Sequence, residues 1–146
     1  MNPYASYQKT QVLEAAPEDI LLQLMQGALV RVKQAQELWE QGEKTRARER
    51  RLRVYDIIAY LDGTLDRESG EKIGEELEAL YAYMLREITE STRLDDFERL
   101  SGVEEVLKTL YEGWKDAVAE YKKEQKAQQL GEYSGQVENG YVAQVG

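Results

Sequence analysis

Between residues 18 and 127 the apolar side chains recur at intervals of three and four, which is the period of an α-helix that packs on one side. No stretch alternates apolar and polar residues in the way that a half-buried strand does. Prolines stand only at positions 3 and 17, so nothing interrupts the long periodic segments. The pattern therefore predicts a chain that is entirely helical.

The periodic segments divide into four helices joined by short polar links. Pro17 suits the first position of a helix, where its missing N–H costs nothing, and Gly42 suits the residue after a helix end. Because short links force sequential helices to run in opposite directions, we expect an all-α, antiparallel four-helix bundle with a short N-terminal helical or extended segment and a flexible C-terminal tail. The expected helices span about residues 17–41, 43–66, 71–91 and 96–127.

The bundle domain is expected to occupy residues 1–127 and the flexible tail residues 128–146. The tail combines four glycines with Gln, Asn and Ser. Such a composition offers too little apolar surface to offset the entropy lost on ordering.

Several apolar residues lie outside the stripe that a bundle core requires. At about 100° per residue, Tyr83 falls roughly 100° from the stripe of its helix, Ile57 stands at the edge of its stripe and Tyr60 lies beyond it. The ten tyrosines, against one phenylalanine, suit a surface that meets both water and protein. The excess favours grooves for an amphipathic partner helix, although single exposed apolar residues are common. The first helix carries an apolar arc of nearly half its circumference, widened by Leu21, Leu22, Met25 and Leu29.

The composition argues against catalysis. The chain has no cysteine and no histidine, so it lacks the thiolate nucleophile, the usual general base and the commonest metal ligand. With 146 residues it can bury a core without a disulfide or a metal. We expect a protein that is not an enzyme, with no catalytic residues, no cofactor and no metal site.

The charge is acidic overall but uneven. The net charge of −9 makes nucleic acid a poor partner. Residues 43–53 nevertheless hold six basic side chains against Glu43 and Glu49. A docking patch is one interpretation of this segment. We favour the other, in which a solvated helix end pairs with acidic neighbours.

No run of about 18 apolar residues occurs, and the N-terminus lacks a basic region followed by an apolar one. We therefore expect neither membrane insertion nor a secretory signal, and a protein that works in the cytosol.

Five short segments of the chain form a recognisable series. They are Asn2-Pro3-Tyr4-Ala5-Ser6-Tyr7-Gln8, Ala15-Ala16-Pro17-Glu18-Asp19-Ile20-Leu21, Gly27-Ala28, Leu80-Tyr81-Ala82-Tyr83-Met84 and Gly113-Trp114-Lys115-Asp116-Ala117. Together they resemble the FliS family of flagellin export chaperones, in that family's order and over about residues 2–120. The chain departs from the family pattern at Gln26, where Asp or Asn is common, at Ala16, where Ser is common, and at Ser91-Thr92, where Ala-Asn is usual.

The resemblance implies a function. Proteins of this family are antiparallel helical bundles that bind the C-terminal segment of flagellin in the bacterial cytosol. They prevent its premature polymerisation and help deliver it to the flagellar type III export apparatus. The bound segment lies partly as helices in surface grooves. The family's N-terminal tyrosine motif, here Tyr4 and Tyr7, lies next to the binding surface.

We combine the two arguments into a prediction of which side chains bind and which form the core. The residues expected to contact the flagellin segment are Tyr4, Tyr7, Leu22, Leu29, Ile57, Tyr60 and Tyr83. The core is expected to include Ile58, Leu61, Leu77, Met84 and Trp114.

Two rival functions remain at this point. A structural or adaptor bundle would use the same apolar surface to self-associate. A carboxylate enzyme with a two-metal site in its core is disfavoured, because such sites use Glu-x-x-His and the glutamates of the third helix fall mainly off the core stripe.

Overall fold

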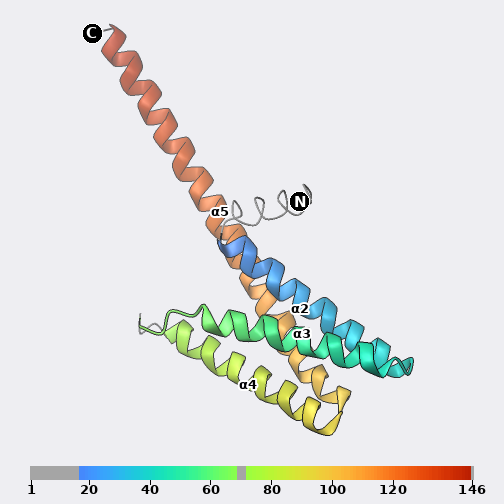
Figure 1. Ribbon diagram of the computed structural model, residues 1–146. Coiled ribbons are helices and arrows are strands. Elements are labelled where there is room, and N and C mark those ends of the chain that lie inside the picture. The colour runs from blue at the N-terminus through green and yellow to red at the C-terminus, as the bar shows by residue number, and fades with distance from the viewer. Residues whose placement is uncertain (1–16, 69–71, 146) are drawn as a thin grey trace, which may run out of the picture. The chain divides into compact units, whose positions relative to one another are not determined.

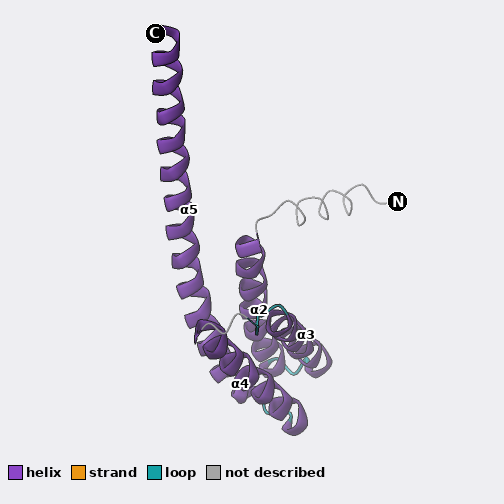
Figure 2. Cartoon of the chain, turned by 90° about the vertical axis from the view of Figure 1, so that its left-hand side faces the viewer, coloured by secondary structure: helices purple, strands orange, loops and turns teal. Residues whose placement is uncertain are grey.

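The computed structural model describes residues 17–68 and 72–145, with side chains for 18–68 and 72–131. All described secondary structure is helical, and no strand occurs in these residues (Figure 2). The chain divides into two compact units, Met1–Glu112 and Gly113–Gly146, each of which is described by itself. The elements in chain order are α2 (Pro17–Glu40), α3 (Lys44–Gly63), α4 (Lys72–Leu94), the short 3-10 helix η1 (Phe97–Arg99) and α5 (Leu100–Val145) (Figure 1).

The predicted all-helical bundle is confirmed, and α3 packs against both α2 and α4 (Figure 1). The last helix differs from the prediction. We expected it to end at about residue 127, but α5 continues to Val145. Glycine weakens a helix by about 1 kcal/mol without breaking it, and no proline stands in this stretch to stop it. A flexible tail over residues 128–146 stays a prediction, and the expected N-terminal segment lies outside the described residues.

The turn between α2 and α3 forms as the glycine predicts. Gly42 has a φ of +81°, a left-handed conformation that glycine adopts without steric cost. The N–H of Gly42 donates to the carbonyl of Trp39 at 3.1 Å, and the N–H of Glu43 donates to the carbonyl of Leu38 at 2.9 Å. These two bonds are the Schellman pattern, which ends α2 and reverses the chain within three residues.

The core of the first unit consists mainly of the predicted stripes. Ile58, Leu61 and Met84 are buried as predicted, whereas Leu77 is only partly buried. Ile73, which shares the predicted stripe with Leu77, is 57% exposed. The first turns of α4 contain no buried residue, and burial begins at Tyr81. The core also contains residues that no stripe predicted, among them Phe97 and Leu100 at the junction of η1 and α5. Trp114 belongs to the second unit, and its core role stays a prediction.

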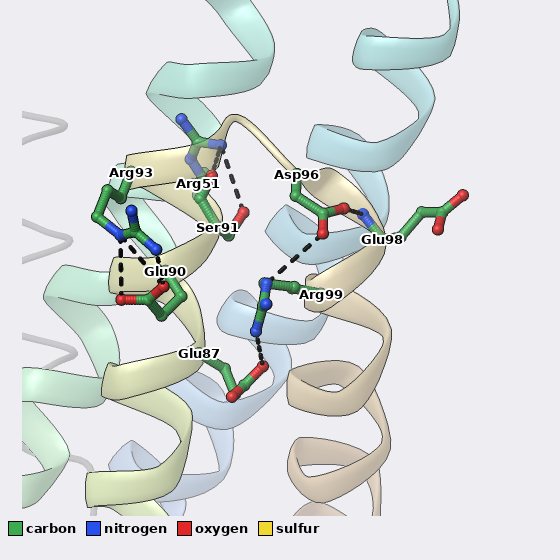
Figure 3. Close-up of polar contacts among 8 residues, drawn as sticks. All are labelled: Arg51, Glu87, Glu90, Ser91, Arg93, Asp96, Glu98 and Arg99. Carbon is green, nitrogen blue, oxygen red and sulfur yellow. Dashed lines mark hydrogen bonds and ion pairs between the residues drawn. The ribbon is translucent and has the colours of Figure 1, made fainter.

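A buried arginine joins α3 to the end of α4. Arg51 is 3% exposed. Its Nη1 donates to the carbonyl oxygen of Ser91 at 2.9 Å and to the Ser91 hydroxyl at 3.3 Å (Figure 3). Its Nη2 donates to Oδ1 of Asp95 at 3.0 Å, and its guanidinium lies 4.3 Å above the ring of Phe97. We call Arg51, Ser91, Asp95 and Phe97 the arginine anchor. It satisfies a charge that would otherwise be costly to bury.

Asp95 has two roles at the end of α4. It is the one non-glycine residue with positive φ in the described part of the chain, at +53°, and the following N–H of Asp96 donates to the carbonyl of Ser91 at 3.0 Å. Asp is among the few residues that tolerate this left-handed conformation. The bend directs the carboxylate toward α3, where it accepts hydrogen bonds from Arg48 and Arg51. These bonds lower the pKa of Asp95 from 3.8 to about 2.

Three of the six basic side chains of residues 43–53 pair with acidic residues, as the favoured interpretation expected, although Arg51 does so while buried rather than solvated. Arg48 and Arg51 both form ion pairs with the carboxylate of Asp95, and Nη1 of Arg53 lies 4.0 Å from Oδ2 of Asp56. A second set of ion pairs joins α4 to η1, where Arg99 approaches Glu87 at 3.4 Å and Asp96 at 3.5 Å (Figure 3).

Replacing the buried arginine tests the anchor. Arg51→Ala removes three hydrogen bonds and the contact with Phe97, and we expect the free energy of unfolding to fall by about 2–4 kcal/mol. Arg51→Lys keeps the charge but lacks the planar fork, so it should retain only part of the stability. Urea unfolding followed by circular dichroism measures both. Equal stability of Arg51→Ala and the native chain would contradict the role of the anchor.

The lowered pKa of Asp95 predicts a pH dependence. A group whose pKa is depressed by folding stabilises the native state above its ordinary pKa and loses that effect as the pH falls through its folded pKa. The extra stability of the native chain relative to Asp95→Asn should therefore be constant above about pH 5. It should shrink as the pH falls through 3.8 toward about 2. Asn suits the left-handed backbone, so the comparison isolates the charge. A stability difference that does not change across this range would refute the ion pairs.

Candidate protein-binding surface

Ile57 lies on the side of α3 that packs against α2. It stands about 100° around the helix from the buried Ile58. A methyl group added at Gly27 of α2 would lie 3.9 Å from Cδ1 of Ile57, so the glycine lets the two helices approach at this point. Ile57 nevertheless remains partly exposed. Its side chain is thus available at the edge of the α2–α3 contact.

Tyr60 continues this edge by one turn. Residues three apart on a helix are surface neighbours, so Tyr60 follows Ile57 on the same side of α3. The Tyr60 side chain is 58% exposed, and among the described residues it is one of the most exposed large aromatic side chains. We call these two residues the Ile57–Tyr60 surface. It offers an apolar side chain and an aromatic ring with a wet hydroxyl, a combination enriched at protein interfaces.

A cation flanks the same edge. Nη1 of Arg31 donates to the carbonyl oxygen of Gly27 at 3.0 Å, which places the guanidinium over the part of α2 that approaches Ile57. Arg31 is partly exposed. A segment that lies here would meet both apolar surface and a positive charge.

Leu22 and Leu29 lie on another side of α2. Around the helix axis, both stand about 100–120° from the buried Ala28. Gly27 lies on the other side of Ala28, whereas Gln36 lies on the same side as the two leucines. Gln36 donates to the hydroxyl of Ser101 at 3.3 Å, so this side of α2 faces the start of α5. Leu22 and Leu29 are partly exposed. The structure therefore does not bring them together with the Ile57–Tyr60 surface.

Tyr83 lies between α4 and α5. A methyl group added at Gly102 of α5 would lie 3.0 Å from the Tyr83 hydroxyl oxygen, and the guanidinium of Arg86 lies 5.9 Å from the Tyr83 ring. Tyr83 is thus partly covered within the first unit, yet it is not buried. Its hydroxyl contact is with the bundle itself, which the sequence pattern did not predict.

The five described candidates thus fall on three sides of the helices, and none is sealed in the core. Tyr4 and Tyr7 lie outside the described residues. Leu52 and Tyr55, which are 60% and 36% exposed, were not among the predicted contacts. The same helical projection could have found them, because Tyr55 and Leu52 stand about 60° and 120° from Ile58 on the side opposite to Ile57.

A polar hollow of about 490 Å³ lies beside the stacked rings of Trp39 and Phe97, whose centroids are 4.4 Å apart. The acidic side chains that line it include Glu40, Asp95 and Glu98. Across residues 18–68 and 72–131, no three carboxylates come close enough together to hold a metal ion. Within the same residues, no helix has both the length and the apolar character needed to cross a membrane.

The first unit is thus an all-helical bundle with partly exposed apolar side chains on α2, α3 and α4. The chain belongs to the FliS family, because the sequence model of that family, described as flagellar protein FliS, matches residues 1–121. It is 31% identical to the flagellar secretion chaperone FliS of Vibrio cholerae over 112 residues, which cover 77% of this chain and 82% of the relative. It is 28% identical to the Bacillus subtilis protein of the same name over 123 residues, covering 84% and 91% of the two chains.

The glycine of α2 gives a prediction for this surface. In Gly27→Ala the new methyl group meets the flexible end of Arg31 at 3.1 Å and Ile57 at an ordinary contact distance of 3.9 Å. If Arg31 moves aside, the better helix propensity of alanine should raise the free energy of unfolding by about 0.5–1 kcal/mol. Thermal unfolding of the two proteins checks this. A clear loss of stability would show that α2 and α3 are closer than described.

Proposed function

We propose that this chain is an export chaperone that binds the disordered C-terminal segment of flagellin in surface grooves of the bundle. By covering that segment it prevents premature polymerisation in the bacterial cytosol and aids delivery to the flagellar type III export apparatus. Tyr4, Tyr7, Leu22, Leu29, Ile57, Tyr60 and Tyr83 are the proposed contacts. No cofactor, nucleic acid or membrane insertion is required.

The observation that carries this proposal is the accessibility of apolar residues on three helices of a FliS-family chain. A segment that folds on binding loses about 2–5 kcal/mol to ordering and needs an interface of roughly 1,000–3,000 Å². One pocket does not supply such an area. Contact positions spread over α2, α3 and α4 suit a segment that wraps around the bundle.

Charge supports the same arrangement at the Ile57–Tyr60 surface. Arg31 on α2 stands beside an apolar edge, so a bound helix can place a carboxylate over the guanidinium and its apolar side chains over Ile57. The exposed tyrosine ring adds area at low entropic cost, since it has only two rotatable bonds to fix.

Calorimetric titration of a flagellin C-terminal peptide into the full chain tests the proposal. We expect Tyr60→Ala and Ile57→Ala each to weaken binding by about 5- to 30-fold, corresponding to about 1–2 kcal/mol. Ile73→Ala is the matched control, because Ile73 is also an isoleucine, is 57% exposed near the start of α4 and is not a proposed contact.

Circular dichroism of each variant should show an unchanged helical fold, so that a loss of affinity reports on contact. Binding that is equally tight in Ile57→Ala, Tyr60→Ala and Ile73→Ala would refute the placement of the flagellin segment. No binding to the native chain would refute the function itself. A native chain that forms a stable oligomer through these residues would instead favour the self-associating bundle.

A further inference from the structure

An apolar groove lies between α3 and α4, on the side of α3 opposite to Ile57. It encloses a hollow of about 620 Å³. We define the α3–α4 groove by six of the residues that line it, namely Leu52, Tyr55, Ile88, Thr92, Arg48 and Arg93.

The floor of the groove is apolar. Ile88 of α4 is buried, while Leu52 and Tyr55 of α3 stand three residues apart and are 60% and 36% exposed. A single exposed leucine on a helix is ordinary. A leucine next to a tyrosine, beside a hollow whose floor is an isoleucine, is a continuous apolar surface of the kind that marks interaction sites.

The rim of the groove is cationic in a protein whose net charge is −9. Three arginines and no carboxylate line the hollow. The side chains of Arg48 and Arg93 are 47% and 64% exposed. The carboxylate of Asp95 serves both Arg48 and Arg51, so this cluster keeps a positive charge.

Arg93 is held by Glu90, at 2.7 Å from Nη2 to the carboxylate oxygen. A guanidinium carries five N–H donors. Arg93 uses two of its nitrogens toward Glu90 and leaves donors free for a second carboxylate. Asp95 and Glu90 thus orient the two rim arginines without occupying all of their donors.

We propose that the α3–α4 groove binds an acidic amphipathic helix of a protein other than the flagellin client. The apolar side of that helix lies on Leu52 and Tyr55, and its carboxylates meet Arg48 and Arg93. Apolar floor and cationic rim together specify this chemistry. A nucleic acid would leave the apolar floor of Leu52 and Tyr55 unused.

The groove is separate from the Ile57–Tyr60 surface. Tyr55 and Ile57 are two residues apart, which places them about 160° from one another around α3. Leu52 and Tyr60 are only about 80° apart around α3, but they lie about 12 Å apart along it. An occupant of the α3–α4 groove therefore leaves the Ile57–Tyr60 surface free. The two sites can be filled together, so the chaperone can hold its client and a second protein at once.

The test uses the full chain and two synthetic helical peptides. One carries leucines at positions i, i+3, i+4 and i+7 with glutamates on both flanks, and its sister carries lysines in place of the glutamates. Fluorescence anisotropy should show the acidic peptide binding at least about tenfold more tightly than its sister, and more weakly as salt is added.

Variants locate the site. Leu52→Ser and Arg93→Gln should each lower the affinity for the acidic peptide by about fivefold or more. Ile73→Ser and Arg53→Gln are the matched controls, with side chains of similar exposure outside the groove, and should leave its affinity unchanged. Absence of binding, equal binding of the two peptides, or equal effects of the groove and control variants would each overturn the proposal.

Two further measurements exclude other occupants. Light scattering should give a monomer, and a dimer that Leu52→Ser dissociates would assign the groove to a second copy of the chain instead. The flagellin C-terminal peptide should bind Leu52→Ser as tightly as the native chain. If Leu52→Ser weakens binding of the flagellin peptide, the groove belongs to the client and the proposal of a separate partner is overturned. If only Ile57→Ala weakens that binding, the two sites are distinct.

Discussion

The arrangement of the first unit depends on the burial of one cation. Arg51 points from α3 into the junction of α4 and η1, where its charge is acceptable only if the carbonyl of Ser91 and the carboxylate of Asp95 are both in reach. That requirement fixes the register of α3 against the end of α4 more strictly than apolar packing does, because apolar side chains tolerate small shifts and a buried guanidinium does not. The ring of Phe97 completes the site and ties η1 to it.

The same register determines which apolar side chains remain accessible. α3 packs with its buried stripe toward the core and has α2 on one side and α4 on the other. Ile57 and Tyr60 stay accessible toward α2, and Leu52 and Tyr55 toward α4. A helix between two neighbours thus leaves two edges with accessible apolar side chains, and the arginine anchor ties this helix to the end of α4.

The sequence predicted the features that repeat along the chain and missed those that depend on single contacts. The spacing of the apolar residues located the helices. Gly42 marked the first turn, because a helix that ends in this way needs a residue with a left-handed backbone conformation. Nothing in the pattern showed that Arg51, one of six basic residues in a short segment, is buried, since that depends on Asp95 arriving from α4. The contact of Tyr83 with Gly102 joins two helices and was equally hidden. The exposure of Tyr60 followed from its angle to the apolar stripe of α3 alone.

The proposed contacts of the flagellin segment on α3 lie on the side near α2. Methyl NMR of isotope-labelled isoleucines and leucines, with the flagellin C-terminal peptide added to the full chain, shows where that segment binds. We expect the Ile57 methyl resonance to shift on binding, while those of Ile73 and Leu52 keep their positions. Shifts at Leu52 or Ile73 with none at Ile57 would show that the segment binds elsewhere.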